Sequence, residues 1–232
     1  MNKTGIIGAM EIEVATLKSL MKIEKTVQKA DMNFCEGTLE GKPVVIVQCG
    51  IGKVNAGICV QILVDLFQVT EIINTGVAGS LNDKLDIGDI LVSTDAVQHD
   101  FDVTPLGYKP GQIPGMDIWS FQADETMADL AVSTCQKVNP DIHVIKGRVA
   151  SGDQFISRPE VKDRLINEFH GDCAEMEGAS IAQACYLNHI PFLVVRAISD
   201  KADDSAQMDY PTFEKKASEH CARLVTEFIK IH

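Results

Sequence analysis

Basic side chains are scarce in this sequence. Its 232 residues include 21 lysines and arginines against 33 aspartates and glutamates, which gives a formal net charge of −12 at pH 7. A nucleic acid is therefore disfavoured as the main partner, because binding to phosphate backbones needs a basic face. No arginine precedes Arg148, so most of the chain also lacks the planar guanidinium group that suits phosphate best.

Long hydrophobic runs are missing as well. None approaches the roughly 20 residues that a membrane-spanning helix needs. The short apolar run at the N-terminus ends at Glu11, which is not typical of a signal peptide. We therefore expect a soluble, cytoplasmic protein with no membrane partner.

The sequence also lacks the cysteine and histidine spacings of known metal sites. Its seven cysteines are scattered and include no Cys-x-x-Cys pair, so buried thiols in a reducing compartment are favoured over a disulfide framework or a zinc site. The six histidines show no metal-ligand spacing. A Gly-x-Ser-x-Gly elbow, typical of serine hydrolases, does not occur. We expect no metal site.

One glycine-rich stretch begins like a nucleotide-binding motif but does not complete it. The stretch Gly50-Ile51-Gly52-Lys53-Val54-Asn55 has Asn55 at the position of the third glycine, and no acidic residue follows at the right distance on a strand, which disfavours a nicotinamide cofactor. Val54 follows Lys53 where a phosphate loop needs serine or threonine. The stretch is better interpreted as a tight turn.

The apolar patterns predict an α/β fold in a single domain, residues 1–232, which is long enough to bury one large core. Buried-strand patterns occur at 4–10, 71–74, 87–97, 144–150 and 192–195, and a hairpin is predicted from 34–39 and 44–47. Helical patterns occur after residue 10, at 54–67, 126–138 and 179–187, and at the C-terminus around 213–228. We expect a mixed, mainly parallel central sheet flanked by helices.

Two further segments carry local signals. Residues 100–122 have no periodicity and contain repeated proline and glycine, yet they also contain aromatic and apolar residues, which favours a functional loop over disorder. The tetrapeptide Ser157-Arg158-Pro159-Glu160 resembles a capping box at the start of the next helix.

Three strand-like runs each lead into acidic residues. The first reaches Glu13, the second the stretch Glu175-Met176-Glu177, and the third Asp200. Because α/β proteins bind ligands at the carboxyl ends of their strands, these acids predict one carboxylate-rich pocket. A simpler interpretation also exists for Glu13 and Glu177, since an acid in the first turn of a helix stabilises the helix dipole.

Carboxylates around a glycosidic carbon can divide the work of breaking its bond. One that is held protonated donates its proton to the leaving group, and one that stays ionised activates water or stabilises an oxocarbenium-like transition state. Carboxylates also accept hydrogen bonds from ribose hydroxyls. The predicted pocket therefore suits cleavage of a bond between a sugar and a base.

A set of motifs in a fixed order covers nearly the whole chain. They include residues 5–11, 50–54, 74–76, 78–79, 99–100, 102–104, 107–108, 111–112, 114–115, 151–153, 155–156, 175–177 and 194–200. In these motifs the sequence resembles the 5′-methylthioadenosine/S-adenosylhomocysteine nucleosidases of the nucleoside phosphorylase superfamily. The resemblance implies a homodimer without a metal or organic cofactor. It also implies hydrolysis of the N-ribosidic bond of 5′-methylthioadenosine, S-adenosylhomocysteine and 5′-deoxyadenosine, with roles in methionine salvage and adenosylhomocysteine detoxification.

The resemblance also implies roles for individual residues. Glu13 would activate the attacking water, Asp200 would assist protonation of adenine N7, and Glu177 would bind the ribose hydroxyls. Other residues would line or support the substrate site: Met10, Ile51, Gly79, Phe155, Ile156, Met176, Ser199 and Tyr210. From the neighbouring subunit, Val103, Leu106 and Pro114 would cover the alkylthio group. Four positions depart from common members of the family: Ile12, Val77, Leu106 and Tyr210.

Three alternatives remain open at this point. A phosphate-dependent purine nucleoside phosphorylase could share the fold, but it would need fixed cations, and Glu13 would repel the anion. A non-catalytic nucleoside-binding module would be expected to lack equivalents of Glu13 or Asp200, and both are present. A nucleosidase for a larger 5′-modified purine nucleoside is the third, because Leu106 and Val77 are smaller or less polar than the residues usual at their positions.

Overall fold

The computed structural model describes residues 2–232 and contains the following helices and strands. The strands are β1 (Thr4–Gly8), β2 (Lys22–Lys29), β3 (Met32–Leu39), β4 (Lys42–Gln48), β5 (Glu71–Ser80), β6 (Ile90–Gln98), β7 (Phe121–Gln122), β8 (Val144–Ser151), β9 (Cys173–Glu175) and β10 (Phe192–Asp200). The helices are α1 (Glu11–Leu20), α2 (Lys53–Phe67), α3 (Glu125–Val138), α4 (Pro159–Phe169), α5 (Gly178–Asn188) and α6 (Ala206–Ile231), with a short 3₁₀ turn at Thr104–Leu106.

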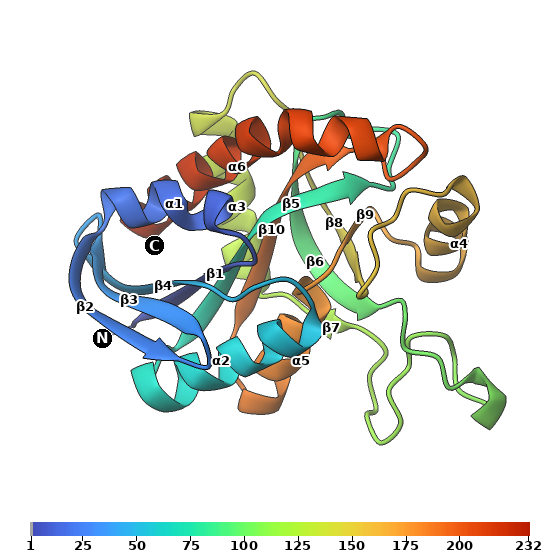
Figure 1. The fold of residues 1–232 in the computed structure, drawn as a ribbon, viewed down its shortest axis with the longest axis horizontal. Helices are drawn as coiled ribbons and strands as arrows, with labels where there is room; N and C mark the ends of the chain where they lie inside the picture. Colours follow the sequence, from blue (N-terminus) through green and yellow to red (C-terminus); the bar gives the residue numbers. More distant parts are fainter. Residues whose placement is uncertain (1) are drawn as a thin grey trace.

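All ten strands belong to one mixed sheet with helices on both faces (Figure 1). The pairs β1–β4, β1–β5, β5–β10 and β6–β8 are parallel, whereas the β2–β3–β4 segment is antiparallel. Strand β10 pairs with both β5 and β6, and β6, β8, β9 and β5 continue the pairing, so these five strands close into a ring. The predicted α/β fold with a mixed sheet flanked by helices is confirmed.

The core lies in two layers, one on each face of the sheet. Helices α1, α3 and α6 cover the upper face in Figure 1, and α2 and α5 cover the lower face. Helix α4 packs with Leu165 and Phe169 on a smaller cluster at the end of β6 and β8. All seven cysteines are buried, as the sequence predicts, and are present as free thiols. No helix within residues 2–232 is both long enough and apolar enough to span a membrane.

Two local features differ from the sequence predictions. The sequence does not predict strand β2, because almost all of its side chains are exposed and its composition is polar. It pairs with β3 at the edge of the sheet, and Val27 is its one side chain that packs against the core. The prediction of a capping box at residues 157–160 is wrong. Helix α4 begins at Pro159, because proline is favoured at the first helical position. Arg158 is therefore the N-cap residue, and no side chain caps the helix.

The sheet brings distant acidic segments to one edge. Strands β1, β5 and β10 are parallel, so their carboxyl ends lie together. At the end of β5, Gly79 pairs with Asp200 of β10 on one side and with Ala174 of β9 on the other. The segment that begins with Ala174 therefore lies across one strand from Asp200.

Candidate active site

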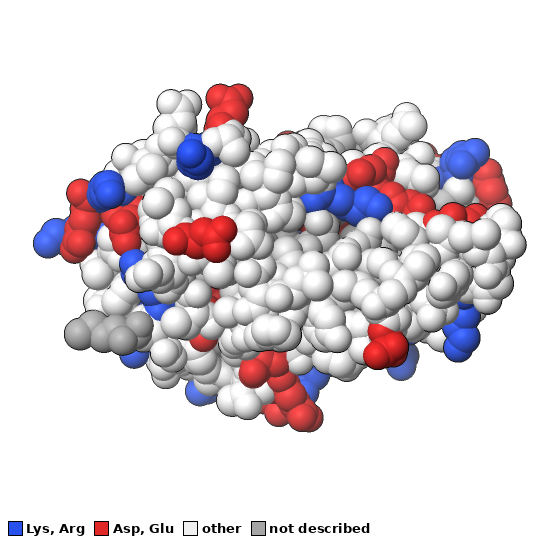
Figure 2. Space-filling model, turned by 90° about the horizontal axis from the view of Figure 1, so that it is seen from below, with Lys and Arg blue, Asp and Glu red and all other residues white. Residues whose placement is uncertain are grey.

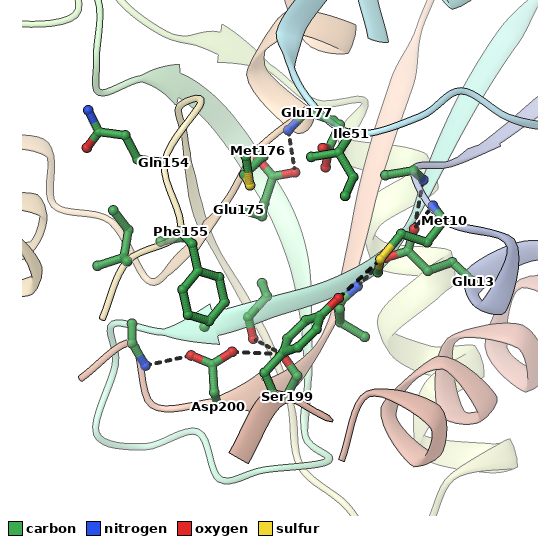
Figure 3. Close-up of a pocket in the computed structure, with 18 residues that line it drawn as sticks. Met10, Glu13, Ile51, Gln154, Phe155, Glu175, Met176, Glu177, Ser199 and Asp200 are labelled. Atoms are coloured by element: carbon green, nitrogen blue, oxygen red, sulfur yellow. Dashed lines mark hydrogen bonds between the residues drawn. The ribbon is translucent and has the colours of Figure 1, made fainter. Parts of the chain in front are cut away.

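A cavity of about 320 Å³ opens at this edge of the sheet, within the range of small-molecule sites. Eleven of the predicted site residues line it (Figure 3): Met10, Glu13, Ile51, Gly79, Phe155, Ile156, Met176, Glu177, Ser199, Asp200 and Tyr210. The remaining wall residues are Ala9, Val77, Ala78, Gln154, Ala174, Glu175 and Ala202. Of these, only Glu175 was predicted, as one of the acids of the carboxylate-rich pocket. Residues from seven separate segments of the chain therefore meet at one cavity.

Glu13 is held by backbone N–H groups from two elements. Its Oε2 accepts the N–H of Ala9 at 2.7 Å and of Met10 at 2.9 Å, and its Oε1 accepts the N–H of Val77 in β5 at 3.1 Å. The bond from Met10 belongs to a capping box at the start of α1, and Glu13 lies in the first turn of that helix, as the simpler interpretation requires. The bond from Val77 goes beyond that role and turns the carboxylate toward the cavity (Figure 3). Burial raises the pKa of Glu13, although Arg196 and these N–H donors oppose the shift.

Gly76 shows how closely Glu13 lies against β5. A Cβ atom at this glycine would collide with the Glu13 carboxylate and would lie 2.6 Å from the Arg196 guanidinium. The sequence therefore needs glycine here for steric reasons, to let a carboxylate and a guanidinium approach the strand.

Asp200 ends β10 and is fixed by two short-range hydrogen bonds. Its Oδ1 accepts the N–H of Ala202 at 2.8 Å, and its Oδ2 accepts the hydroxyl of Ser199 at 2.9 Å. Burial raises the pKa of Asp200, and these two donors only partly offset it. A Cβ at Gly79 would lie 2.7 Å from Asp200 Oδ1, so Gly79 also makes room for a carboxylate.

Glu175 and Glu177 have different environments although they are two residues apart. Glu175 contacts the Ser151 hydroxyl and the Arg196 guanidinium, and accepts the N–H of Gly178 at 2.8 Å. Burial opposes its ionisation, but Arg196 and these donors together lower the pKa of Glu175. Glu175, rather than Glu177, is therefore the acid that caps the N-terminus of α5.

Glu177 faces the cavity with fewer partners. Its Oε1 accepts the N–H of Gly52 at 2.9 Å, and its Oε2 lies 3.7 Å from Arg196 Nη2. Burial, followed by the negative charge of Glu175, raises the pKa of Glu177 to about 8. Of the two neighbouring carboxylates, Glu177 is thus the one that can exchange a proton near neutral pH.

Arg196 and Asn74 form a buried polar contact behind the cavity that the sequence analysis did not select. Arg196 is almost completely buried in β10, and its Nη2 donates to Asn74 Oδ1 at 2.6 Å as well as to Glu175. A signal was present, because a charged residue inside an apolar strand needs a buried partner of opposite charge. The partner could not be identified because it lies on another strand.

Two aromatic side chains and a thioether close one side of the cavity. The Tyr210 hydroxyl lies 3.1 Å from Met10 Sδ, and its ring packs edge-on against Phe155 at a centroid distance of 5.7 Å. Tyr210 is one of the four positions that depart from common members of the family. The structure shows it used within the site wall.

The three residues expected from a neighbouring subunit lie away from this cavity in the same chain. Leu106 and Pro114 are exposed, and Val103 is half-buried. The loop that carries them projects from the body of the molecule (Figure 1). Their predicted role stays a prediction. Within residues 2–232 no cluster of three or more His, Cys, Asp or Glu side chains is arranged to hold a metal ion.

Comparisons with known proteins give the class of this fold and site. Residues 3–230 match the phosphorylase superfamily, to which the chain therefore belongs. A 5′-methylthioadenosine/S-adenosylhomocysteine nucleosidase from Halalkalibacterium halodurans is 41% identical and aligns over 99% of this chain and 98% of its own. Within the superfamily, the chain belongs to the family of 5′-methylthioadenosine/S-adenosylhomocysteine nucleosidases.

Solved structures agree with this assignment. The Neisseria meningitidis nucleosidase of this family, in complex with methylthio-immucillin-A, matches with a TM-score of 0.96 and 34% identity over all of both chains. A futalosine hydrolase of Helicobacter pylori matches with a TM-score of 0.94 and 31% identity over 100% of this chain and 98% of its own.

Proposed function

We propose that the protein hydrolyses the N-ribosidic bond of 5′-methylthioadenosine, S-adenosylhomocysteine and 5′-deoxyadenosine and so releases adenine. The observation that carries this proposal is the presence of Glu13, Glu177 and Asp200 on one cavity, each buried and each with a raised pKa. Such carboxylates suit acid and base catalysis at neutral pH. The reaction would serve methionine salvage and amino-acid biosynthesis, and would remove adenosylhomocysteine.

In the proposed mechanism Asp200 is the acid and Glu13 the base. The C1′–N9 bond breaks with its electron pair moving into the purine, and Asp200 donates a proton to adenine N7. A water molecule attacks C1′ of the oxocarbenium-like sugar, and Glu13 takes a proton from that water. The raised pKa of Glu13 makes it a stronger base than an ordinary glutamate.

The remaining wall residues would hold the substrate. Glu177 would accept hydrogen bonds from the ribose hydroxyls, with Met176 packed against the sugar. Phe155 and the backbone of Ile156 would hold adenine. Met10, Ile51 and Tyr210 would surround the 5′ substituent.

The charge of the cavity favours water over phosphate as the nucleophile. No lysine or arginine is among the described residues that line it. Arg196 lies behind the wall, where it contacts Glu175 and Asn74. A phosphorylase would need cations free to bind the anion, and Glu13 would repel it.

Relatives support a nucleoside substrate but leave its 5′ group open. The Neisseria meningitidis structure holds methylthio-immucillin-A, whereas the Helicobacter pylori neighbour is a futalosine hydrolase. Both share this fold, so a larger 5′ substituent is compatible with it. We infer an adenosine thioether from the higher identity to the nucleosidases.

We also propose a homodimer in which each subunit completes its partner's site. The root of the loop at residues 101–120 is fixed: Trp119 Nε1 donates to the Pro110 carbonyl at 2.7 Å, and its ring stacks on Phe169. The tip is not covered, since Leu106 is 73% exposed. A fixed loop with an uncovered apolar tip suits a contact outside its own chain.

The outer face of α2 and α5 supports the same proposal. Exposed apolar side chains occur along it at Val54, Ile58 and Leu66 of α2 and at Leu187 of α5. Figure 2 views the molecule from this side, and the middle of the face carries few charged residues. Apolar, weakly charged faces are typical of subunit interfaces. We place the protein in the cytoplasm because its seven buried thiols are unpaired.

The proposed activity is tested by incubating the purified protein with each of the three nucleosides and measuring the released adenine by chromatography. We expect release from all three. Tight binding without release would contradict the proposal and would favour the non-catalytic nucleoside-binding module.

A further inference from the structure

A ring of polar contacts joins three segments behind the cavity wall. Lys53 Nζ lies 2.5 Å from Asp100 Oδ1, and the Asp153 N–H donates to Asp100 Oδ2 at 2.9 Å. Asp153 Oδ1 in turn accepts the Lys53 N–H at 2.8 Å. Each of the three residues therefore contacts the other two. The side chains of Lys53 and Asp100 are only 19% and 14% exposed, so solvent screens this pair less than a surface ion pair.

The ring borders the turn that holds Glu177. Gly52 directly precedes Lys53, and its N–H donates to Glu177 Oε1. Gly52 is the N-cap residue of α2 and has no side chain to cap the helix. Asp153 supplies that cap by accepting the Lys53 N–H. A Cβ at Gly52 would lie 3.1 Å from Asp153 Oδ1, so Asp153 packs directly against this turn.

The ring also borders the segment predicted to hold adenine. Asp153 is followed by Gln154, Phe155 and Ile156, which all line the cavity. Asp100 follows β6 and begins the projecting loop. The Asp100 carboxylate thus connects the turn at Gly52, the segment 154–156 and the root of the loop at residues 101–120.

We propose that Asp100 is a positioning residue for ribose binding, which holds Lys53 and Asp153 so that the Gly52 N–H keeps the Glu177 carboxylate in place. The inference rests on the ribose-binding role proposed for Glu177. Without the Asp100 carboxylate, Lys53 loses its ion pair and one of the two donors to Asp100 loses its acceptor. The turn at Gly52 is then less well fixed. A small displacement of a group that orients substrate lowers turnover strongly.

The test compares two substrates in the Asp100→Asn variant, whose side chain has nearly the same shape. The substrates are 5′-methylthioadenosine and its 2′,3′-dideoxy analogue, which lacks both hydroxyls that Glu177 would bind. We expect kcat/KM for 5′-methylthioadenosine to fall about tenfold and that for the analogue to fall less than about threefold. If the analogue reacts too slowly, inhibition constants of adenosine and 2′,3′-dideoxyadenosine give the same comparison.

Two further variants separate positioning from general damage. Lys53→Met breaks the ring from its other side, so its effect and that of Asp100→Asn should not add in the double variant. Glu36→Gln removes the 2.7 Å ion pair to Lys3, remote from the cavity, and should leave both substrates unchanged. Equal losses for both substrates, or no loss for either, would overturn the proposal. Failure of the unaltered protein to hydrolyse 5′-methylthioadenosine would instead contradict the proposed function, and this inference with it.

Discussion

The Arg196 guanidinium contacts Glu175 directly but lies 3.7 Å from the carboxylate of Glu177. The buried guanidinium therefore stabilises the ionised form of Glu175 more than that of Glu177. Glu175 has a lowered pKa, whereas the pKa of Glu177 is raised to about 8, by burial first and then by the charge of Glu175. The acidic stretch 175–177 thus contains two different groups. Glu175 is the ion-pair partner of Arg196, and Glu177 is the group that can titrate at the cavity.

The pH dependence of stability follows from the raised pKa of Glu177. Folded Glu177 keeps its proton up to about pH 8, whereas in the unfolded chain the group loses it above the ordinary pKa of 4.5. The contribution of this protonation to the free energy of unfolding is therefore fully present below pH 4.5 and is lost as pH rises toward 8. Glu177→Gln removes this titration. We expect thermal unfolding midpoints of the variant to fall less between pH 6 and 8 than those of the unaltered protein, measured by calorimetry. A parallel pH profile for the two proteins would contradict the raised pKa.

Removal of the proposed base should affect chemistry rather than binding. In Glu13→Gln the amide oxygen can take the place of Oε2 and accept the N–H groups of Ala9 and Met10, whereas the Val77 N–H loses its acceptor, so most of the contacts that hold the side chain remain and the fold should be preserved. We expect kcat for 5′-methylthioadenosine to fall by about 10²–10⁴-fold with little change in nucleoside affinity. Single-turnover kinetics and calorimetric binding measure the two separately. Near-normal turnover would refute the role given to Glu13.

Removal of the proposed acid should depend on the leaving group. Asp200→Asn keeps a side chain of the same shape beside Ser199 but can no longer donate the carboxyl proton. We expect a loss of about 10²–10⁴-fold for adenine nucleosides, and less than about tenfold for a 4-nitrophenyl riboside, whose leaving group needs no protonation. Similar losses for both substrates would mean that Asp200 is not the acid.

Gly76 offers a steric test of how the site is built. Gly76→Ala places a Cβ against Glu13 and Arg196, so we expect a loss of about 1–3 kcal/mol in unfolding free energy together with lower kcat. Gly57→Ala is the matched control, since its Cβ would meet only Ser180 Oγ at an ordinary 3.4 Å and alanine favours the helix by about 0.5–1 kcal/mol. Urea unfolding of both variants measures the difference. A Gly76→Ala protein as stable as the unaltered one would contradict the close approach of Glu13 to β5.

The proposed dimer predicts that an interface variant damages the site at a distance. Ile58→Asp puts a charge on the apolar face of α2, outside the cavity. We expect a monomer by light scattering, and a kcat/KM for 5′-methylthioadenosine at least about tenfold lower because the partner's loop is lost. A fully active monomer would show that Leu106 and its neighbours do not complete a partner's site.

Much of the fold could be predicted from the sequence because buried strands and amphipathic helices carry distinct apolar patterns. Strand β2 could not, because its polar residues have no buried face and its position depends on β3. The four acids of the cavity, Glu13, Glu175, Glu177 and Asp200, could be found because each follows a strand-like run. The cluster of Arg196, Asn74 and Ser151 around Glu175 depends on which strands are neighbours, and the ring around Asp100 depends on loop contacts across the sheet edge. Neither arrangement is a local property of the chain.

The most direct test of the central claim, that this site uses water as its nucleophile, is the phosphate dependence of adenine release. Purified protein is incubated with 5′-methylthioadenosine in phosphate-free buffer and then with added phosphate, and both sugar products are identified by mass spectrometry. We predict the same rate in both buffers and free 5-methylthioribose as the product. Adenine release only in the presence of phosphate, with 5-methylthioribose 1-phosphate as the product, would contradict the account.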